Sequence, residues 1–216
     1  MKVRKGFVSN SSSSSFIVYD KSDTMIEQHI PENMVYYTED WVAPSMNDHF
    51  DFKLVPTINL PCELGKTEFG WDFERCYDIV TRLNWCAIQL LFAKKRDLDC
   101  NYKDQHIDWY DMMHNFKDVV YKELGYNVRF DYNSIEDDGV DGGYANIDHQ
   151  SAAYEDLSIA AFFLDKEAIK AFLCGEHSYY QGGNDNCDPT EEWLASCKKM
   201  DSESYEEHIE EVGNEN

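Results

Sequence analysis

The most apolar continuous stretch of the chain is residues 71–93, which read WDFERCYDIVTRLNWCAIQLLFA and contain neither glycine nor proline. Apolar residues recur in it at steps of three and four, the spacing that places side chains on one face of an α-helix. Trp85, Cys86, Ile88 and Phe92 widen this face almost all the way round toward the C-terminal end. A helix that is apolar on nearly every side is typical of one enclosed by other elements. We therefore predict that residues 71–93 form a central scaffold helix, without catalytic groups, around which the chain packs.

Composition indicates a folded, strongly acidic protein. The chain has 216 residues, of which 43% are hydrophobic and 14% aromatic, and this suffices for a hydrophobic core. Its 42 acidic and 19 basic residues give a formal net charge of −23. A field of that sign repels nucleic acid and anionic membranes and attracts basic surfaces. We therefore predict no direct binding to nucleic acid and no membrane contact.

Cysteine usage and hydropathy point to the cytoplasm. The seven cysteines form no CxxC pair, and several fall on apolar helical faces, as reduced core residues do. No apolar run approaches the length of a membrane span. We expect a cytoplasmic protein with reduced thiols.

The N-terminal segment contains the polar run Ser9–Ser15 between two short apolar pieces. Serine and asparagine side chains compete for backbone hydrogen bonds, so the run favours a loop. One interpretation of residues 1–20 is a flexible hairpin or arm. The other is a hydroxyl-rich strip that is modified or recognised.

Three segments carry a resemblance to known sequences. GFVSNSSSSSF at Gly6–Phe16 resembles an N-terminal signature of otherwise unrelated, mostly uncharacterised proteins from bacteriophages and some bacteria. IDHQS at Ile147–Ser151 and FLCGEHSYYQGGNDN at Phe172–Asn186 resemble a pattern in uncharacterised phage-type proteins. The resemblance implies a phage or prophage origin and hence the cytoplasm of a host cell. It implies no catalytic residue.

Other segments follow helical or strand periodicity. Residues 107–124 have an amphipathic helical pattern that Gly125 ends. Residues 126–132 alternate apolar and polar side chains, as a half-buried strand does, and we expect residues 143–149 to pair with it. Residues 21–70 read as short strands and loops that cover one side of the central helix.

The C-terminal half is predicted to contain further short elements. Residues 157–164 are apolar enough for a buried strand or helix, and we favour a strand. Asp165 is placed to cap a helix that runs to Cys174 and ends at Gly175. The acidic segment 189–216 begins with a strong helix-start signal, and for its final stretch a docked helix and a disordered tail both remain open.

These elements predict an α+β fold, with two long amphipathic helices packed against a small, mainly antiparallel sheet. We expect residues 1–188 to form a single domain and residues 189–216 to form an acidic, helical C-terminal segment.

The acidic excess is unevenly distributed along the chain. Residues 73–125 carry nine acidic and eight basic residues, whereas residues 189–216 carry nine and two. The sharpest clusters are Asp137, Asp138 and Asp141, and Glu206, Glu207, Glu210 and Glu211. One interpretation is an acidic binding face made from these seven residues, and the other is a well-solvated surface.

Two hypotheses about function follow. The first is a phage-encoded, non-enzymatic interaction protein whose acidic surface binds a basic host protein, with nucleic-acid mimicry or an anti-defence role as particular forms of that binding. The second is a small metal-dependent hydrolase or nuclease-like enzyme that uses Asp148, His149 and Asp185. The segments that hold these three residues also fit plain turns. The sequence has no calcium-loop, zinc-finger, P-loop or dinucleotide-binding spacing, so we predict no cofactor and no metal.

Overall fold

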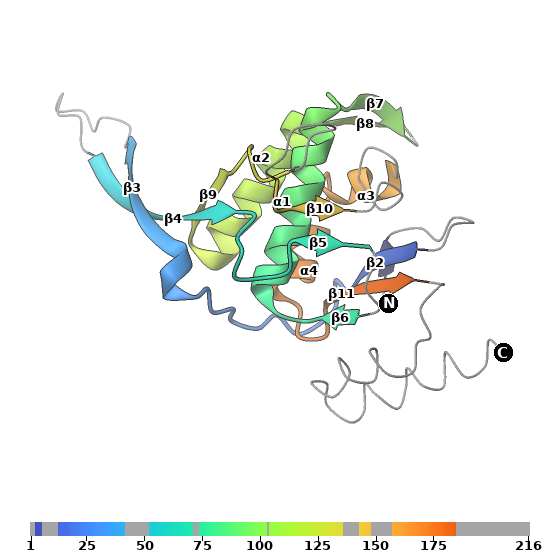
Figure 1. The fold of residues 1–216 in the computed structure, drawn as a ribbon, viewed down its shortest axis with the longest axis horizontal. Coiled ribbons are helices and arrows are strands. Elements are labelled where there is room, and N and C mark those ends of the chain that lie inside the picture. Colours follow the sequence, from blue (N-terminus) through green and yellow to red (C-terminus); the bar gives the residue numbers. More distant parts are fainter. Residues whose placement is uncertain are drawn as a thin grey trace.

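The computed structural model describes residues 3–5, 13–41, 52–70, 74–102, 104–135, 143–147 and 157–184. This part of the chain is an α+β protein in which helices pack with several small sheets (Figure 1). The helices are α1 (Ile79–Lys95), α2 (Trp109–Val119), its π-helical continuation η2 (Val120–Leu124), α3 (Leu157–Phe162), α4 (Lys166–Cys174) and the 3₁₀ turn η1 (Glu32–Met34). The strands are β1 (Val3–Lys5), β2 (Ser13–Tyr19), β3 (Val35–Trp41), β4 (Phe52–Leu60), β5 (Glu68–Phe69), β6 (Glu74–Cys76), β7 (Asp99–Tyr102), β8 (Gln105–Asp108), β9 (Asn127–Phe130), β10 (Asn146–Ile147) and β11 (Tyr179–Asn184).

Helix α1 is the centre of the fold, as predicted. Every residue from Ile79 to Ala93 is buried, and the helix packs against α2, α4, β4, β10 and β11. The predicted start at Trp71 was wrong, because the helix begins at Ile79. The Asp78 side chain caps it by accepting a hydrogen bond from the Thr81 amide at 2.8 Å, and the preceding residues form β6.

The second predicted helix is also confirmed, with a later start. Asp108 caps α2 by accepting a 2.7 Å hydrogen bond from the Asp111 amide, so Ile107 belongs to β8 instead. Gly125 follows η2 with φ of 82°, the left-handed conformation of a glycine stop.

Helix α4 begins and ends where the sequence predicted. The Asp165 side chain accepts a hydrogen bond from the Ala168 amide at 3.1 Å. Gly175 ends the helix with a negative φ of −66°, so close packing requires the glycine there: an added Cβ would lie 2.5 Å from the Ala171 carbonyl oxygen. The buried Arg82 of α1 donates to the carbonyl oxygens of Phe172 (2.8 Å) and Gly175 (3.3 Å) and so joins the two helices.

The prediction of a strand at residues 157–164 was wrong. Residues Leu157–Phe162 form α3, in which Ile159 and Phe162, three residues apart, are buried. The two alanines in this segment favour a helix over a strand. Phe162 packs edge-on against Trp85 of α1, so the helix adds an aromatic face to the core.

The sheets differ from the predicted hairpin. Strand β9 lies within residues 126–132 as expected, but it pairs in parallel with β4 and, of the expected partner residues 143–149, not with the described residues 143–147. Of those, Asn146–Ile147 form β10, which pairs in parallel with β5. The pairing with β4 sets Val128 beside Ile58 and Phe130 beside Leu60, so four buried side chains share one face. That burial explains why the distant partner is preferred.

The serine run contributes a strand within a four-stranded sheet of order β1-β2-β11-β6. Ser13–Ser15 were predicted to lie in a loop, and they belong to β2 instead. Ser15 pairs with Gly182 and Ser14 with Gly183 of β11, so ladder hydrogen bonds outweigh the local preference of serine. The pairing lays parts of two resemblance segments, Gly6–Phe16 and Phe172–Asn186, side by side.

Candidate functional site

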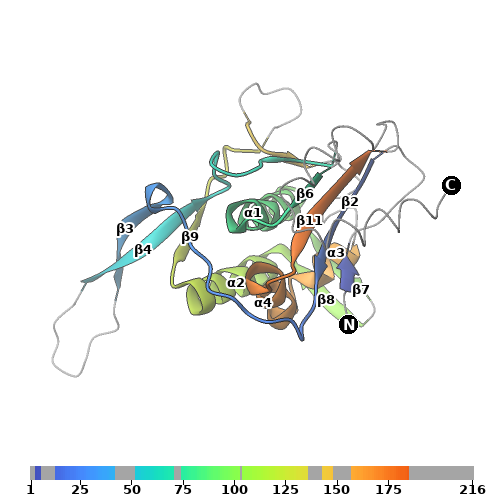
Figure 2. The same cartoon turned by 90° about the horizontal axis from the view of Figure 1, so that it is seen from below.

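The hairpin of β3 and β4 extends away from the helices (Figures 1 and 2). Tyr37 is opposite Pro56, and Glu39 is opposite Leu54. Directly opposite residues point to the same side of a sheet, and so do residues two apart on one strand. Tyr37, Glu39, Leu54 and Pro56 therefore share one face, which we call the docking patch.

The docking patch continues an apolar face that is buried nearer the helices. On β4, Ile58 and Leu60 of the same face are 0% exposed, and β4 packs against α1. Further out, Tyr37 is 68% exposed and Leu54 is 62% exposed. The sheet face that packs on the core near the helices thus continues outward past the end of the core, where its large side chains are exposed to water.

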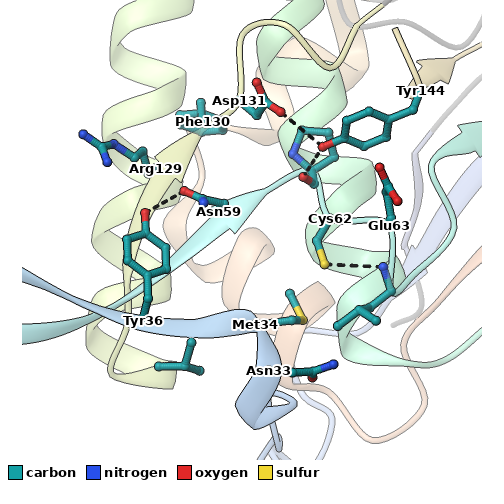
Figure 3. Close-up of a pocket in the computed structure, with 13 residues that line it drawn as sticks. Asn33, Met34, Tyr36, Asn59, Cys62, Glu63, Arg129, Phe130, Asp131 and Tyr144 are labelled. Atoms are coloured by element: carbon teal, nitrogen blue, oxygen red, sulfur yellow. Dashed lines mark hydrogen bonds between the residues drawn. The ribbon is translucent and has the colours of Figure 1, made fainter. Parts of the chain in front are cut away.

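A cavity of about 650 Å³ lies at the base of the hairpin (Figure 3). It is bounded by η1 and the start of β3, by the end of β4 with the turn that follows, and by the end of β9. Its lining includes Tyr36, Asn59, Glu63, Arg129, Asp131 and Tyr144.

Hydrogen bonds fix the walls of this cavity. The Tyr36 hydroxyl donates to Asn59 Oδ1 at 2.6 Å. The Tyr144 hydroxyl donates to the Pro61 carbonyl oxygen at 2.9 Å and lies 3.3 Å from Asp131 Oδ2 (Figure 3).

Helix α1 fixes the turn after β4 through the side chain of Asn84. Asn84 of α1 is fully buried; it accepts a hydrogen bond from the Cys62 amide and donates to the Cys62 and Lys66 carbonyl oxygens. The central helix therefore positions the segment that carries Glu63.

Two negative side chains converge on one end of the cavity. The pKa of the Tyr144 hydroxyl is raised to about 12. Burial is the largest cause, followed by the charge of Asp131 and its hydrogen bond, and then by the charge of Glu63. Among the described residues, no cationic side chain forms an ion pair with Asp131 or Glu63. The phenol therefore stays protonated at neutral pH, between carboxylates whose charge is not neutralised by the described residues.

An aspartate–histidine pair lies elsewhere, beside a second cavity of about 350 Å³. His177 Nδ1 is 2.9 Å from Asp23 Oδ1, and the His177 amide donates to Asp23 Oδ2 at 2.8 Å. Burial raises the pKa of Asp23, but the hydrogen bonds from His177 and Thr24 outweigh it and leave the pKa below its usual value. The carboxylate orients the imidazole, an arrangement that general bases use. The nearby Ser22 hydroxyl already donates its proton to Asp20, so it is not placed as a nucleophile for His177 to activate. The Asp23–His177 pair is therefore best explained as a link between the loop after β2 and the α4–β11 turn.

The residues predicted as sites lie outside the described residues. This holds for Asp148, His149 and Asp185 of the enzyme hypothesis, for the seven acidic residues Asp137, Asp138, Asp141, Glu206, Glu207, Glu210 and Glu211, and for the whole of residues 189–216. The structure therefore neither brings them together nor separates them, and both arrangements remain predictions.

The features found in the structure were missed at the sequence level. Asp23 and His177 are 154 positions apart. The cavity draws on residues from Asn33 to Tyr144. The one available signal was the strand-like composition of residues 21–70, with β-branched and aromatic residues between breakers, which predicted short strands but not their register.

No family model, no curated protein and no solved structure matches the chain. The resemblance to phage-type proteins therefore stays a prediction. Within the described ranges, no helix has the length and apolar character needed to cross a membrane. Those ranges also contain no group of three histidine, cysteine or acidic side chains suited to a metal ion.

Proposed function

We propose that this protein is a non-enzymatic interaction protein that binds a basic protein through the docking patch of the β3–β4 hairpin. The observation that carries the proposal is the exposure of Tyr37 and Leu54 on a sheet face that is fully buried at Ile58 and Leu60. Clustered apolar side chains left in water mark interaction surfaces, and tyrosine is enriched among the residues that dominate binding energy.

The chemistry of the partner follows from charge. A chain with a formal charge of −23 attracts positively charged surfaces over several ångströms, and the exposed Glu39 puts a carboxylate within the patch itself. The partner is thus a basic protein with an apolar contact surface. If the basic partner is itself a nucleic-acid-binding protein, the acidic chain acts as a mimic of its nucleic acid.

The serine-rich resemblance supports a phage-encoded protein that acts on a host protein in the host cytoplasm. In this proposal the acidic residues at 137–141 and 206–211 strengthen the same attraction.

The test is site-specific photo-crosslinking. A benzoylphenylalanine residue replaces Tyr37, and in a matched control it replaces Tyr110, which is 63% exposed and lies at the start of α2, directly after β8. Both proteins are irradiated in a bacterial lysate at low and at high salt, and the crosslinked species are identified by mass spectrometry.

The proposal predicts a basic protein that is crosslinked at position 37, is not crosslinked at position 110, and is lost at high salt, because exposed charge attraction is screened over about 8 Å at physiological ionic strength. Crosslinks of equal yield at both positions, or an acidic species at position 37, would contradict it.

A further inference from the structure

The cavity at the base of the hairpin is separate from the docking patch. Three lining residues alternate in position with the docking patch. Tyr36 is adjacent to Tyr37 on β3, and Asn59 is an odd number of positions from Leu54 on β4. Arg129 of β9 is opposite Asn59. Alternating positions point to opposite sides of a sheet. These three lining residues therefore face the side opposite the docking patch, and none of the four docking-patch residues lines the cavity.

The cavity is formed in advance of any ligand. The Tyr36–Asn59 and Tyr144–Pro61 hydrogen bonds hold its sides, and Asn84 holds the turn on its floor. A site whose walls are already fixed loses little conformational entropy on binding.

At one end of the cavity, the carboxylates of Asp131 and Glu63 are hydrogen-bond acceptors. Asp131 Oδ1 accepts a hydrogen bond from the Asn133 amide at 3.1 Å, and its Oδ2 lies near Tyr144. An ionised carboxylate has about four acceptor sites, so Asp131 keeps free acceptor capacity. Glu63 is exposed on the rim and adds a second negative charge.

The remaining lining suits an aliphatic stem. Met34 and Leu64 contribute apolar surface, and Arg129, the one cationic side chain among the described lining residues, directs its guanidinium away from Glu63 and Asp131 (Figure 3). The end that holds the two carboxylates is therefore open to an added cation.

We infer that this cavity binds an organic cation, namely an ammonium or guanidinium group on an aliphatic stem, between Asp131 and Glu63. The stem lies along Met34 and Leu64, and the cation donates hydrogen bonds to the Asp131 carboxylate. The negative field of the whole chain raises the local concentration of such cations. A lysine or arginine side chain and a free diamine share this chemistry.

The test is an NMR titration of the ¹⁵N-labelled full chain with three probes. These are the peptide acetyl-Gly-Arg-Gly-amide, the same peptide with neutral citrulline in place of arginine, and putrescine. We expect saturable shifts of the Cys62, Leu64 and Tyr144 amides with the arginine peptide or with putrescine, and none with the citrulline peptide. The tighter of the two cations identifies the source as a polypeptide side chain or a free diamine.

Two variants test the residues. Asp131→Asn is expected to weaken binding about tenfold, as loss of a hydrogen bond to a charged group does. Glu63→Gln is expected to weaken it about threefold, and it leaves the fold intact because Glu63 is exposed. Glu167→Gln, an equal charge change at an exposed position on α4, should leave the affinity unchanged.

Equal shifts with the citrulline and arginine peptides would refute the inference, and so would an unchanged affinity in Glu63→Gln. Because the cavity lining includes no residue of the docking patch, either outcome leaves the proposed function standing, and loss of crosslinking at Tyr37 leaves the cation site standing.

Discussion

Replacing Asn84 with alanine tests how the core supports the candidate sites. Asn84 is 0% exposed and makes three hydrogen bonds to backbone groups: with the Cys62 amide at 2.8 Å, the Cys62 carbonyl at 2.6 Å and the Lys66 carbonyl at 3.0 Å. These bonds connect the central helix to the turn that carries Glu63.

The expected cost follows from the number of bonds. Each intramolecular hydrogen bond contributes about 1 kcal/mol net, so Asn84→Ala should lower the free energy of unfolding by about 3 kcal/mol. Asn115→Ala is the matched control, because the Asn115 side chain makes one hydrogen bond within the described part of the chain, to the Phe163 carbonyl at 3.1 Å, and should cost about 1 kcal/mol. The difference of roughly 2 kcal/mol is large against a typical total stability of about 5–15 kcal/mol.

The assay is urea unfolding at neutral pH followed by tryptophan fluorescence, since Trp85 is 1% exposed in the folded core. We expect a much lower midpoint for Asn84→Ala than for Asn115→Ala, with similar slopes. If the two variants unfold at the same urea concentration, the Asn84 hydrogen bonds do not hold the turn, and the cavity is not fixed in advance by the central helix.

Three further outcomes are expected. Asp23→Asn should destabilise the protein above about pH 4, and this effect should disappear at lower pH, because a carboxyl whose folded pKa is depressed stabilises the fold only while it is ionised. The urea midpoints of the wild type and the variant are compared from about pH 3 to 7, and a difference that stays constant with pH would contradict the prediction. Gly175→Ala should cost about 1–3 kcal/mol by overpacking, since its Cβ would lie 2.5 Å from both the Ala171 carbonyl oxygen and Ser178 Oγ; an unchanged midpoint would show that the turn relaxes freely. Cys86 should resist thiol reagents until the protein unfolds, because full burial raises its pKa well above the usual value; native wild type and Cys86→Ala should therefore show equal numbers of reactive thiols.

Local signals in the sequence predicted what depends on neighbouring residues. The Asp165 cap and the stops at Gly175 and Gly125 were correct because each is set within one helical turn. The start of the central helix was missed because the apolar pattern extends upstream of Asp78, and only the pairing of β6 with β11 shows that the chain is extended there.

Long-range pairing was not predictable from periodicity. The alternation in residues 126–132 predicted a strand, but its partner Thr57–Leu60 is about seventy positions earlier in the chain. The serine strand likewise depends on β11, near the other end of the chain. The candidate sites combine such distant segments, so the sequence could supply their residue types but not their geometry.

The most direct test of the central proposal is the affinity of the protein crosslinked at position 37. Its dissociation constant is measured by calorimetry for the wild type, for the double variant Tyr37→Ser/Leu54→Ser, and for the control Tyr110→Ser, at low and physiological salt. Loss of two central apolar side chains should cost about 2–4 kcal/mol, which weakens binding roughly 30- to 1,000-fold, whereas Tyr110→Ser should bind as the wild type does and salt should weaken all three complexes. Equal affinity of the double variant and the wild type, or binding that does not change with salt, would contradict the account.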